Sequence, residues 1–495
     1  MGLVGLGCGD DAVQGTGCWF AVPALADGRS IACGYVSVPE RRQGESRGNI
    51  RIAFAQIRAA AAFGDQTPVF YLQGGPGGNI VDSAPTFAQA VAPVIAADRD
   101  LVLIDQRGVG RSEPFLACPP TNDPNASAQA LIDNCRNQLT LAGVDLRAYN
   151  TQENAADIDA VRRALGYPQV TLYGSSYGSL LAQQVMRDFP DAVAGAVLDA
   201  VVPKTPSFLA ELPASANGAL SDLFASCAAD AACTQRYGDL EATFNAVVAR
   251  VQSQPTTVDL ARFPEPAVTV DITAEVLVSE MLVDGLLFLG LGERAPQVIE
   301  WARDAEEDSV ARRQLADVLR FLRSFGSAGG SLFSAGMFYS VVCSESGLYD
   351  ATAINTADTR PAVQDIYAPR ASSIPAECAL WNVPPLPAEV LQPVQSAVPT
   401  LLLSGALDPR TPPRFASVVA GGLSAATNVV VAGAGHGIIL ASECTNSVTA
   451  QFIRAPSGAL DTACVSTVAP AFTVQAPLPT APAARQALQL RWQLR

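Results

Sequence analysis

Short apolar, β-branched segments alternate with helical segments along much of the chain, and this alternation restricts the fold more than any other feature of the sequence. The segments predicted as strands are 69–74, 101–106, 170–174 and 194–202. The segments with helical periodicity among them are 154–165 and 177–189. Strands that are apolar throughout and separated by helices are typical of a parallel sheet covered on both faces. The sequence therefore predicts an α/β fold.

The alternation is interrupted once and then resumes. Residues 203–395 carry helical periodicity, over 221–251 and 273–325, whereas the strand pattern returns at 399–405 and 427–433. We therefore expect a helical cap inserted into an α/β core. The expected division is an N-terminal segment (1–17), the first part of the core (18–202), the cap (203–395), the second part of the core (396–468) and a Pro/Ala-rich tail (469–495).

Composition excludes several classes of function. Hydrophobic residues make up 49% of the chain, enough for a large core, and the net charge is −15, with no basic stripe that would bind nucleic acid or an anionic membrane. The chain has one histidine, His436, one lysine, Lys204, no CxxC and no GxxxxGK[ST] motif. Multi-histidine metal sites, zinc ribbons and phosphate-binding loops are therefore excluded, and we expect neither a metal nor a cofactor. The most apolar run, Val276–Leu291, is interrupted by Glu280 and Asp284, so we expect no transmembrane helix.

Ten of the eleven cysteines form neighbouring pairs that could close short loops. These pairs are Cys18/Cys33, Cys118/Cys135, Cys227/Cys233, Cys343/Cys378 and Cys444/Cys464. Spacing alone does not prove connectivity, and the alternative is a set of buried free thiols in a cytosolic protein. We expect disulfides, and hence a secreted or periplasmic protein.

The eleventh cysteine, Cys8, ends the segment MGLVGLGC, which resembles the last part of a bacterial lipoprotein signal. Gly5 stands where such signals usually carry leucine. One interpretation is lipid attachment at Cys8, which would place the protein on the bacterial cell envelope. The other is an ordinary N-terminal segment.

The motif Gly-Ser-Ser-Tyr-Gly at 174–178 lies where a predicted strand ends and a helix begins. In this position a GxSxG motif fits a nucleophile elbow, in which small neighbours allow a tight turn that exposes the Ser176 hydroxyl. The Tyr177 amide, at the helix N-terminus, could then stabilise an oxyanion. The alternative is a Gly/Ser-rich turn without chemistry.

A serine needs a base to act as a nucleophile at neutral pH, and His436 is the only imidazole in the chain. It lies between glycines after a predicted strand, and Asp408 follows the preceding strand. A carboxylate there can orient the imidazole, although an Asx turn before Pro409 would also explain Asp408. The order Ser176, Asp408, His436 is the order found in α/β-hydrolases.

A glycine-rich loop, 74–78, follows the first of the predicted strands. Glycines let backbone amides approach a substrate oxygen closely, so this loop is a candidate for the second oxyanion donor. The alternative is a glycine loop without a catalytic role.

With these motifs, the sequence resembles the prolyl and tripeptidyl aminopeptidase family of serine α/β-hydrolases. The matching segments are CGYVSVPE (33–40), QGGPGG (73–78), DQRGVGRS (105–112), GSSYGS (174–179), LDPRTP (407–412) and GAGHG (433–437). The resemblance implies an α/β-hydrolase fold and a catalytic triad in which Ser176 is the nucleophile, Asp408 the orienting acid and His436 the base. It also implies an oxyanion hole formed by the Gly75 and Tyr177 amides.

The same resemblance bears on the substrate. Gln73 stands where prolyl aminopeptidases usually carry histidine. This difference argues against strict proline specificity but not against hydrolysis. Exopeptidases of this family bind the free α-amine of the substrate with acids of the cap, and the segment YSVVCSESG (339–347) points to Glu345, with Glu280 as a second candidate. The alternative for either residue is a solvated surface carboxylate.

The function expected from the sequence is that of a serine aminopeptidase acting on peptides with a free N-terminus. A carboxylesterase on the same scaffold is the alternative within enzymes. A binding protein with a decayed site is the alternative outside them, and the complete Ser/Asp/His set argues against it.

Overall fold

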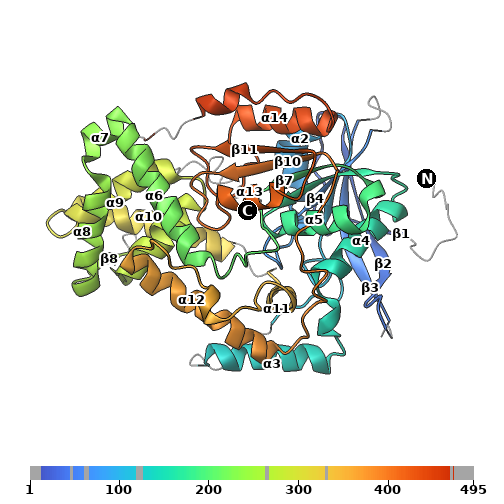
Figure 1. Cartoon of the computed structure of the whole chain (residues 1–495), viewed down its shortest axis with the longest axis horizontal. Helices are drawn as coiled ribbons and strands as arrows, with labels where there is room; N and C mark the ends of the chain where they lie inside the picture. The colour runs from blue at the N-terminus through green and yellow to red at the C-terminus, as the bar shows by residue number, and fades with distance from the viewer. Residues whose placement is uncertain are drawn as a thin grey trace.

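The computed structural model describes residues 13–44, 48–60, 66–118, 126–261, 267–328, 333–468 and 472. Within these residues a nine-stranded sheet has the order β1-β2-β3-β5-β4-β6-β7-β10-β11 (Figure 1). Cys8 and almost all of the tail at 469–495 lie outside the described residues, so the lipid-anchor prediction is not addressed by the structure.

In the order of the sheet, the six strands from β5 to β11 are parallel to one another. The strands β1, β2 and β3 pair antiparallel with their neighbours. Their bounds are β1 (Val13–Thr16), β2 (Ser30–Pro39), β3 (Asn49–Arg58), β4 (Val69–Leu72), β5 (Leu101–Ile104), β6 (Val170–Ser175), β7 (Val193–Asp199), β10 (Thr400–Gly405) and β11 (Ala426–Val431). The parallel strands are those that the apolar runs predicted. Strand β1 lies in the segment predicted only as an N-terminal extension, and its four exposed residues carry no apolar signal.

Helices cover both faces of this sheet, as the apolar strands require. On one face lie η2 (Val81–Ser83), α1 (Ala84–Thr86), η3 (Phe87–Val91), α2 (Ala92–Ile95) and α14 (Glu443–Arg454). On the other lie α4 (Thr151–Ala164), α5 (Tyr177–Asp188) and α13 (Pro413–Ala420). Each face has its own buried apolar cluster, so the sheet is the middle layer of a three-layer fold. The fold is that of an α/β-hydrolase.

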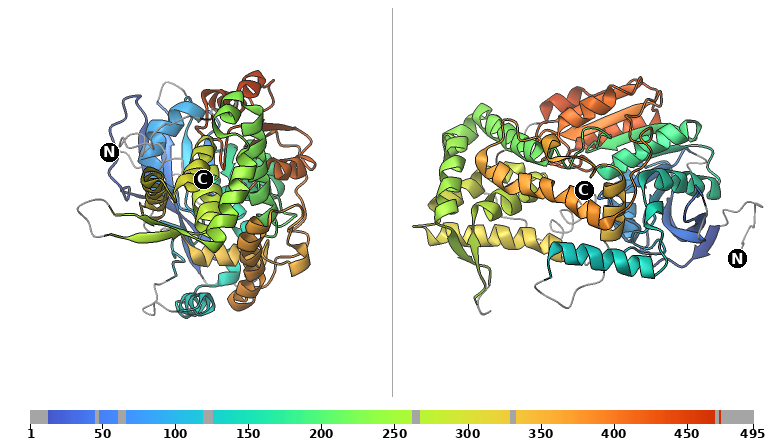
Figure 2. Two further views of the ribbon diagram at one scale, coloured as in Figure 1. Left: turned by 90° about the vertical axis from the view of Figure 1, so that its left-hand side faces the viewer. Right: turned by 60° about the horizontal axis from the view of Figure 1, so that its bottom comes forward.

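Between β7 and β10 the chain leaves the sheet and forms a mainly helical insert. Its elements are α6 (Leu212–Ala229), α7 (Ala231–Tyr237), α8 (Leu240–Ser253), β8 (Thr256–Asp259), β9 (Thr269–Ile272), η6 (Val276–Leu287), η7 (Gly292–Arg294), α9 (Ala295–Asp304), α10 (Ser309–Ala328), α11 (Ala335–Ser344), η8 (Ala351–Ala353) and α12 (Pro361–Trp381). The hairpin β8–β9 was not predicted. Figure 2 shows it projecting from the insert in the left view.

The segment predicted as helical over 221–251 is helical, and it is divided among three helices. Asp230 caps α7 by accepting a hydrogen bond from the Cys233 amide, and Asp239 caps α8 in the same way. Gly238, at φ 65°, ends α7 between these two caps. Capping side chains and a left-handed glycine therefore override a helical periodicity that runs through all three.

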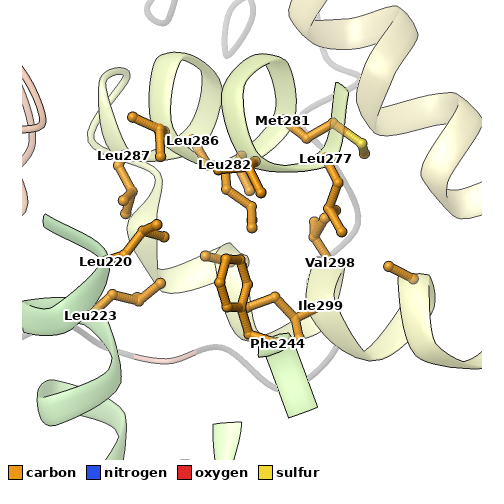
Figure 3. Packing of buried hydrophobic residues seen from close by; sticks show 14 of the residues in the cluster. Leu220, Leu223, Phe244, Leu277, Met281, Leu282, Leu286, Leu287, Val298 and Ile299 are labelled. Atoms are coloured by element: carbon orange, nitrogen blue, oxygen red, sulfur yellow. The ribbon is translucent and has the colours of Figure 1, made fainter. Parts of the chain in front are cut away.

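The apolar run Val276–Leu291 is buried inside the insert. Most of it forms η6, a π-helix, whose leucines point towards α6, α8 and α9 (Figure 3). Among the described residues, no helix is both long enough and apolar enough to cross a membrane.

The insert is also joined to the core by α12. This helix packs against α6 of the insert and against α3 (Ala128–Leu141), which precedes α4 in the chain. Figure 2 shows α12 (orange) lying between the insert and α3 in the right view.

All five predicted cysteine pairs are present as disulfides, which confirms the predicted pairing. The bonds are Cys18–Cys33, Cys118–Cys135, Cys227–Cys233, Cys343–Cys378 and Cys444–Cys464. Five disulfides fit an extracellular or periplasmic protein.

Candidate active site

Ser176 occupies a strained turn between β6 and α5. Its backbone angles are φ 55° and ψ −124°, a region that residues with a side chain rarely adopt. A Cβ on Gly178 would lie 1.9 Å from the Leu72 carbonyl oxygen, and one on Gly174 would lie 2.2 Å from the Gly178 oxygen. Both glycines are therefore sterically required, and the turn has the geometry of a nucleophile elbow.

The glycine-rich loop after β4 lies directly against this turn. A Cβ on Gly74 would be 2.8 Å from the Ser176 Cβ and 3.3 Å from its Oγ. Gly75 has a φ of 121°, which glycine adopts without strain. Tyr177 is the first residue of α5, so its N–H has no acceptor within the helix. Tyr177 thus follows Ser176 in the chain, and Gly74, the neighbour of Gly75, lies against Ser176 in space.

Asp105 holds this loop in place, and sequence reasoning missed it. Its carboxylate accepts hydrogen bonds from the amides of Ile80 (2.6 Å), Val81 (3.0 Å) and Arg111 (2.8 Å). Burial raises the pKa of Asp105 to about 6, despite these three hydrogen bonds. Asp105 opens the DQRGVGRS motif, so the sequence does carry a signal for it. Arg107 of the same motif is buried in an ion pair with Asp157 at 2.8 Å.

Asp408 and His436 form a buried pair at the ends of β10 and β11. His436 Nδ1 lies 3.0 Å from Asp408 Oδ1 and 2.9 Å from Oδ2, and the two side chains are 2% and 0% exposed. Burial acts to raise the pKa of Asp408, but His436 and hydrogen bonds from Thr411 outweigh it and hold the pKa below its usual value. The structure therefore brings together the two residues that the sequence proposed as base and orienting acid.

Thr411 is a further contact of this pair that sequence reasoning missed. Its Oγ1 donates to Asp408 Oδ2 at 2.6 Å and lies 3.1 Å from His436 Nδ1. The Thr411 amide also donates to Asp408 Oδ1 at 2.9 Å. The Arg410 amide donates to Asp408 Oδ1 at 2.8 Å, so the Asx turn that was the alternative for Asp408 is present as well, because a carboxylate has enough lone pairs for both roles.

Asp199 joins the elbow to the histidine loop. Its backbone carbonyl accepts the Ser176 N–H at 2.8 Å, and its carboxylate accepts the amides of Ile438 (2.8 Å) and Ile439 (3.1 Å). Tyr173 donates a further hydrogen bond at 2.7 Å, and burial raises the pKa of Asp199. The structure records no hydrogen bond between Ser176 Oγ and the His436 ring; such contacts often form only when substrate is bound.

Glu345 lies at the end of α11 and is buried. Its carboxylate accepts hydrogen bonds from the amide and the hydroxyl of Thr151, both at 2.8 Å, and that hydroxyl lies 2.9 Å from the Tyr177 hydroxyl. Burial raises the pKa of Glu345, and the positive charge of Lys204 opposes this. The pKa of Lys204 is lowered by burial to about 8. Both residues line a pocket of about 360 Å³.

Glu280 lies in a different environment. It is 42% exposed on η6 and forms an ion pair with Arg323, with 2.9 Å between Oε2 and Nη2. The two candidate amine-binding acids therefore contact different residues, Thr151 for Glu345 and Arg323 for Glu280. Glu280 matches the alternative of a solvated surface carboxylate. Among the described residues, no group of three or more metal-ligating side chains is found.

Comparison with known proteins agrees with this geometry. The family described as alpha/beta hydrolase fold matches residues 67–237, and the family described as TAP-like protein matches residues 364–464. The chain has the α/β-hydrolase fold, and it resembles the prolyl and tripeptidyl aminopeptidase family of serine α/β-hydrolases.

The curated relatives include proteins with peptidase names. Serine protease Hip1 of Mycobacterium tuberculosis is 30% identical over 246 residues, which cover 45% of this chain and 46% of that protein. Tripeptidyl aminopeptidase of Streptomyces coelicolor is 32% identical over 192 residues, covering 35% and 36% respectively. Proline iminopeptidase of Neisseria gonorrhoeae is 30% identical over 143 residues, covering 29% and 35%. The matches span less than half the length of each of these relatives.

Proposed function

We propose that the protein is a serine aminopeptidase that releases single residues or short peptides from free N-termini through an acyl-enzyme. The observation that carries the proposal is the buried Asp408–His436 pair, joined through Asp199 to the strained Ser176 turn. A buried imidazole held by a carboxylate near a serine on an elbow is suited to acyl transfer.

In this mechanism His436 takes the proton of the Ser176 hydroxyl as Oγ attacks the scissile carbonyl carbon. Asp408 keeps the Nδ1 proton in place and stabilises the imidazolium that forms. The amides of Gly75 and Tyr177 donate to the oxyanion of the tetrahedral intermediate. His436 then gives its proton to the leaving amine, and a water molecule, activated by the same imidazole, hydrolyses the acyl-enzyme.

The proposed reader of the substrate's ammonium group is Glu345. It is buried, and Thr151 connects its carboxylate to the side-chain hydroxyl of Tyr177, whose backbone amide is the proposed oxyanion donor. The proposed cap, residues 203–395, supplies this acid. We further propose that the enzyme acts outside the cytosol, because its five disulfides need an oxidising compartment.

One observation favours the alternative, a carboxylesterase. Both Glu345 oxygens already accept hydrogen bonds from Thr151, and Lys204 lies close enough to lower the pKa of Glu345. A carboxylate that is already compensated gains less from an additional ammonium group. On an esterase, the same pocket would bind an uncharged group.

Two measurements test the proposal. Fluorophosphonate labelling followed by peptide mapping should place the adduct on Ser176, and an unlabelled protein would contradict the serine hydrolase mechanism. A panel of peptide amides with free or acetylated N-termini should then show at least a tenfold higher kcat/KM for the free amines. Equal rates on both, together with rapid ester hydrolysis, would replace the aminopeptidase with the esterase.

A further inference from the structure

The end of η6 contacts the catalytic histidine from inside the insert. The Phe288 ring stacks on the His436 ring, with 4.6 Å between centroids and 16° between planes. The Phe288 carbonyl also accepts the His436 N–H at 3.2 Å. A Cβ on Gly435 would lie 1.9 Å from the Leu287 oxygen, so the backbones of the two segments are in direct contact. His436 is thus held by the insert through both its ring and its backbone.

The same helix also holds the loop of the catalytic acid. Asp284, one turn before Phe288, accepts a hydrogen bond from Arg410 Nη2 at 2.8 Å, and the Arg410 amide donates to Asp408 Oδ1 at 2.8 Å. Asp284 is itself fixed by Tyr367 of α12, whose hydroxyl lies 3.0 Å away. The chain around Asp408 is therefore linked to η6 through one ion pair.

Apolar packing makes these links rigid. Leu407, next to Asp408, is buried within the apolar cluster of the insert, and a Cβ on Gly292 would lie 2.7 Å from its Cδ1. Leu282 and Leu286 of η6 belong to the same cluster, in which their side chains point towards α6, α8 and α9 (Figure 3). The element that contacts both catalytic loops is thus anchored in a core of its own. A π-helix is uncommon, and such helices occur frequently at functional sites.

We propose that η6 is the positioning element of the Asp408–His436 pair, with Phe288 and Asp284 as its positioning residues. The inference rests on the proposed triad but not on the choice between peptidase and esterase. A flat ring stacked on the imidazole limits its rotation, and its negative face favours the imidazolium formed during acylation. The Asp284–Arg410 ion pair fixes the loop that carries Asp408, and Asp408 contacts Nδ1 of the same imidazole.

The test is the rate at which a fluorophosphonate phosphonylates Ser176, with loss of fluoride, a step that needs Ser176 and His436 but no bound amine. Phe288→Leu keeps an apolar side chain and removes the stacked ring, so the phosphonylation rate should fall about threefold to thirtyfold. With an ester substrate the loss should appear in kcat, with KM changed less than twofold. Phe288→Tyr, which restores a ring, should recover most of the rate.

The matched control is Phe224→Leu, the same change in the same insert. Phe224 packs on Phe244 in the apolar cluster, and its ring faces the Arg360 guanidinium. This variant should lose thermal stability as Phe288→Leu does, but it should be phosphonylated at the wild-type rate. Asp284→Asn should lower the rate about threefold to tenfold.

Two results would overturn the proposal: a folded Phe288→Leu that is phosphonylated at the wild-type rate, or an equal loss in Phe224→Leu. A wild-type protein that is not labelled at Ser176 would instead refute the serine hydrolase mechanism on which the inference rests.

Discussion

Three aspartates that are almost inaccessible to solvent surround the site, and each has a different task. Asp105 binds the amides that follow the oxyanion loop, Asp199 joins the elbow to the histidine loop, and Asp408 faces the imidazole. Only Asp408 has its pKa held below the usual value, because only it accepts hydrogen bonds from His436 and Thr411. For the other two, burial raises the pKa. The acid that would stabilise a positive charge is therefore the one kept ionised most firmly.

Ser176 and His436 are expected to act as one unit. Ser176→Ala should remove most of the activity, and adding His436→Ala should cost little more, because triad residues contribute non-additively. The measurement is kcat/KM for the two single variants and the double variant. Turnover similar to wild type in either single variant would contradict the assignment. Addition of EDTA should leave kcat/KM unchanged.

Glu345→Gln should lower kcat/KM on free-amine peptides by about 10- to 150-fold, because a charge-assisted contact contributes roughly 1.5–3 kcal/mol. The change should barely affect a small ester without an amine, since the triad and the oxyanion hole are untouched. The matched control is Glu280→Gln, which removes a surface ion pair and should change neither rate. An equal loss on both substrates would show that Glu345 is structural, acting through Thr151.

At the scale of elements, the sequence predicted the parallel strands well because each is apolar throughout and short. It missed β2 and β3, which pair antiparallel at the edge of the sheet, and the exposed β1. It also missed the caps at Asp230 and Asp239, because periodicity alone does not reveal where a side chain caps a helix.

The residues of the candidate site also differ in whether the sequence alone could reveal them. Ser176, Asp408 and His436 could be proposed from the sequence because each lies in a local motif with its own steric signal. Asp199 and Phe288 could not, since each acquires its contact from a segment more than a hundred residues away. Nothing in the local sequence distinguishes Phe288 from its apolar neighbours.

The disulfides should differ in how much they stabilise the fold. Cys343–Cys378 joins α11 to α12 across 35 residues, whereas Cys227–Cys233 closes only 6. From loop-closure entropy, replacing both cysteines by alanine should cost about 4 kcal/mol for the first pair and about 2 kcal/mol for the second. Urea unfolding of the two double variants checks this order. Equal losses would mean that packing around the sulfurs, rather than the loops, sets the cost.

At the scale of the whole molecule, stability and activity should respond to acid in opposite directions. The pKa of Asp105 is about 6 in the folded protein, above its usual value near 4, so between these values the folded state binds more protons than the unfolded chain. The free energy of unfolding should therefore rise by about 1–2 kcal/mol from pH 7 to pH 5 through this residue. Asp408, with its lowered pKa, stabilises the fold above its usual pKa, and that stabilisation is lost only as the pH falls below that value.

Activity should fall as the solution is made more acidic, because a protonated imidazole cannot accept the Ser176 proton. Urea unfolding and kcat/KM measured from pH 5 to pH 7 test this opposition. Asp105→Asn is the control and should flatten the rise in stability. A wild-type protein whose stability falls in parallel with its activity would contradict the prediction.

The contacts of η6 and Phe288 with both catalytic loops have a consequence for exchanging the insert between related hydrolases. In many hydrolases an inserted domain would be treated as an exchangeable module that determines which substrate fits. Here a chimera that received a foreign insert would lose Asp284 and Phe288, and with them the partners of Arg410 and His436. The smallest segment set that keeps these contacts is therefore η6 together with the two loops after β10 and β11. An active chimera would have to receive all three from the same protein.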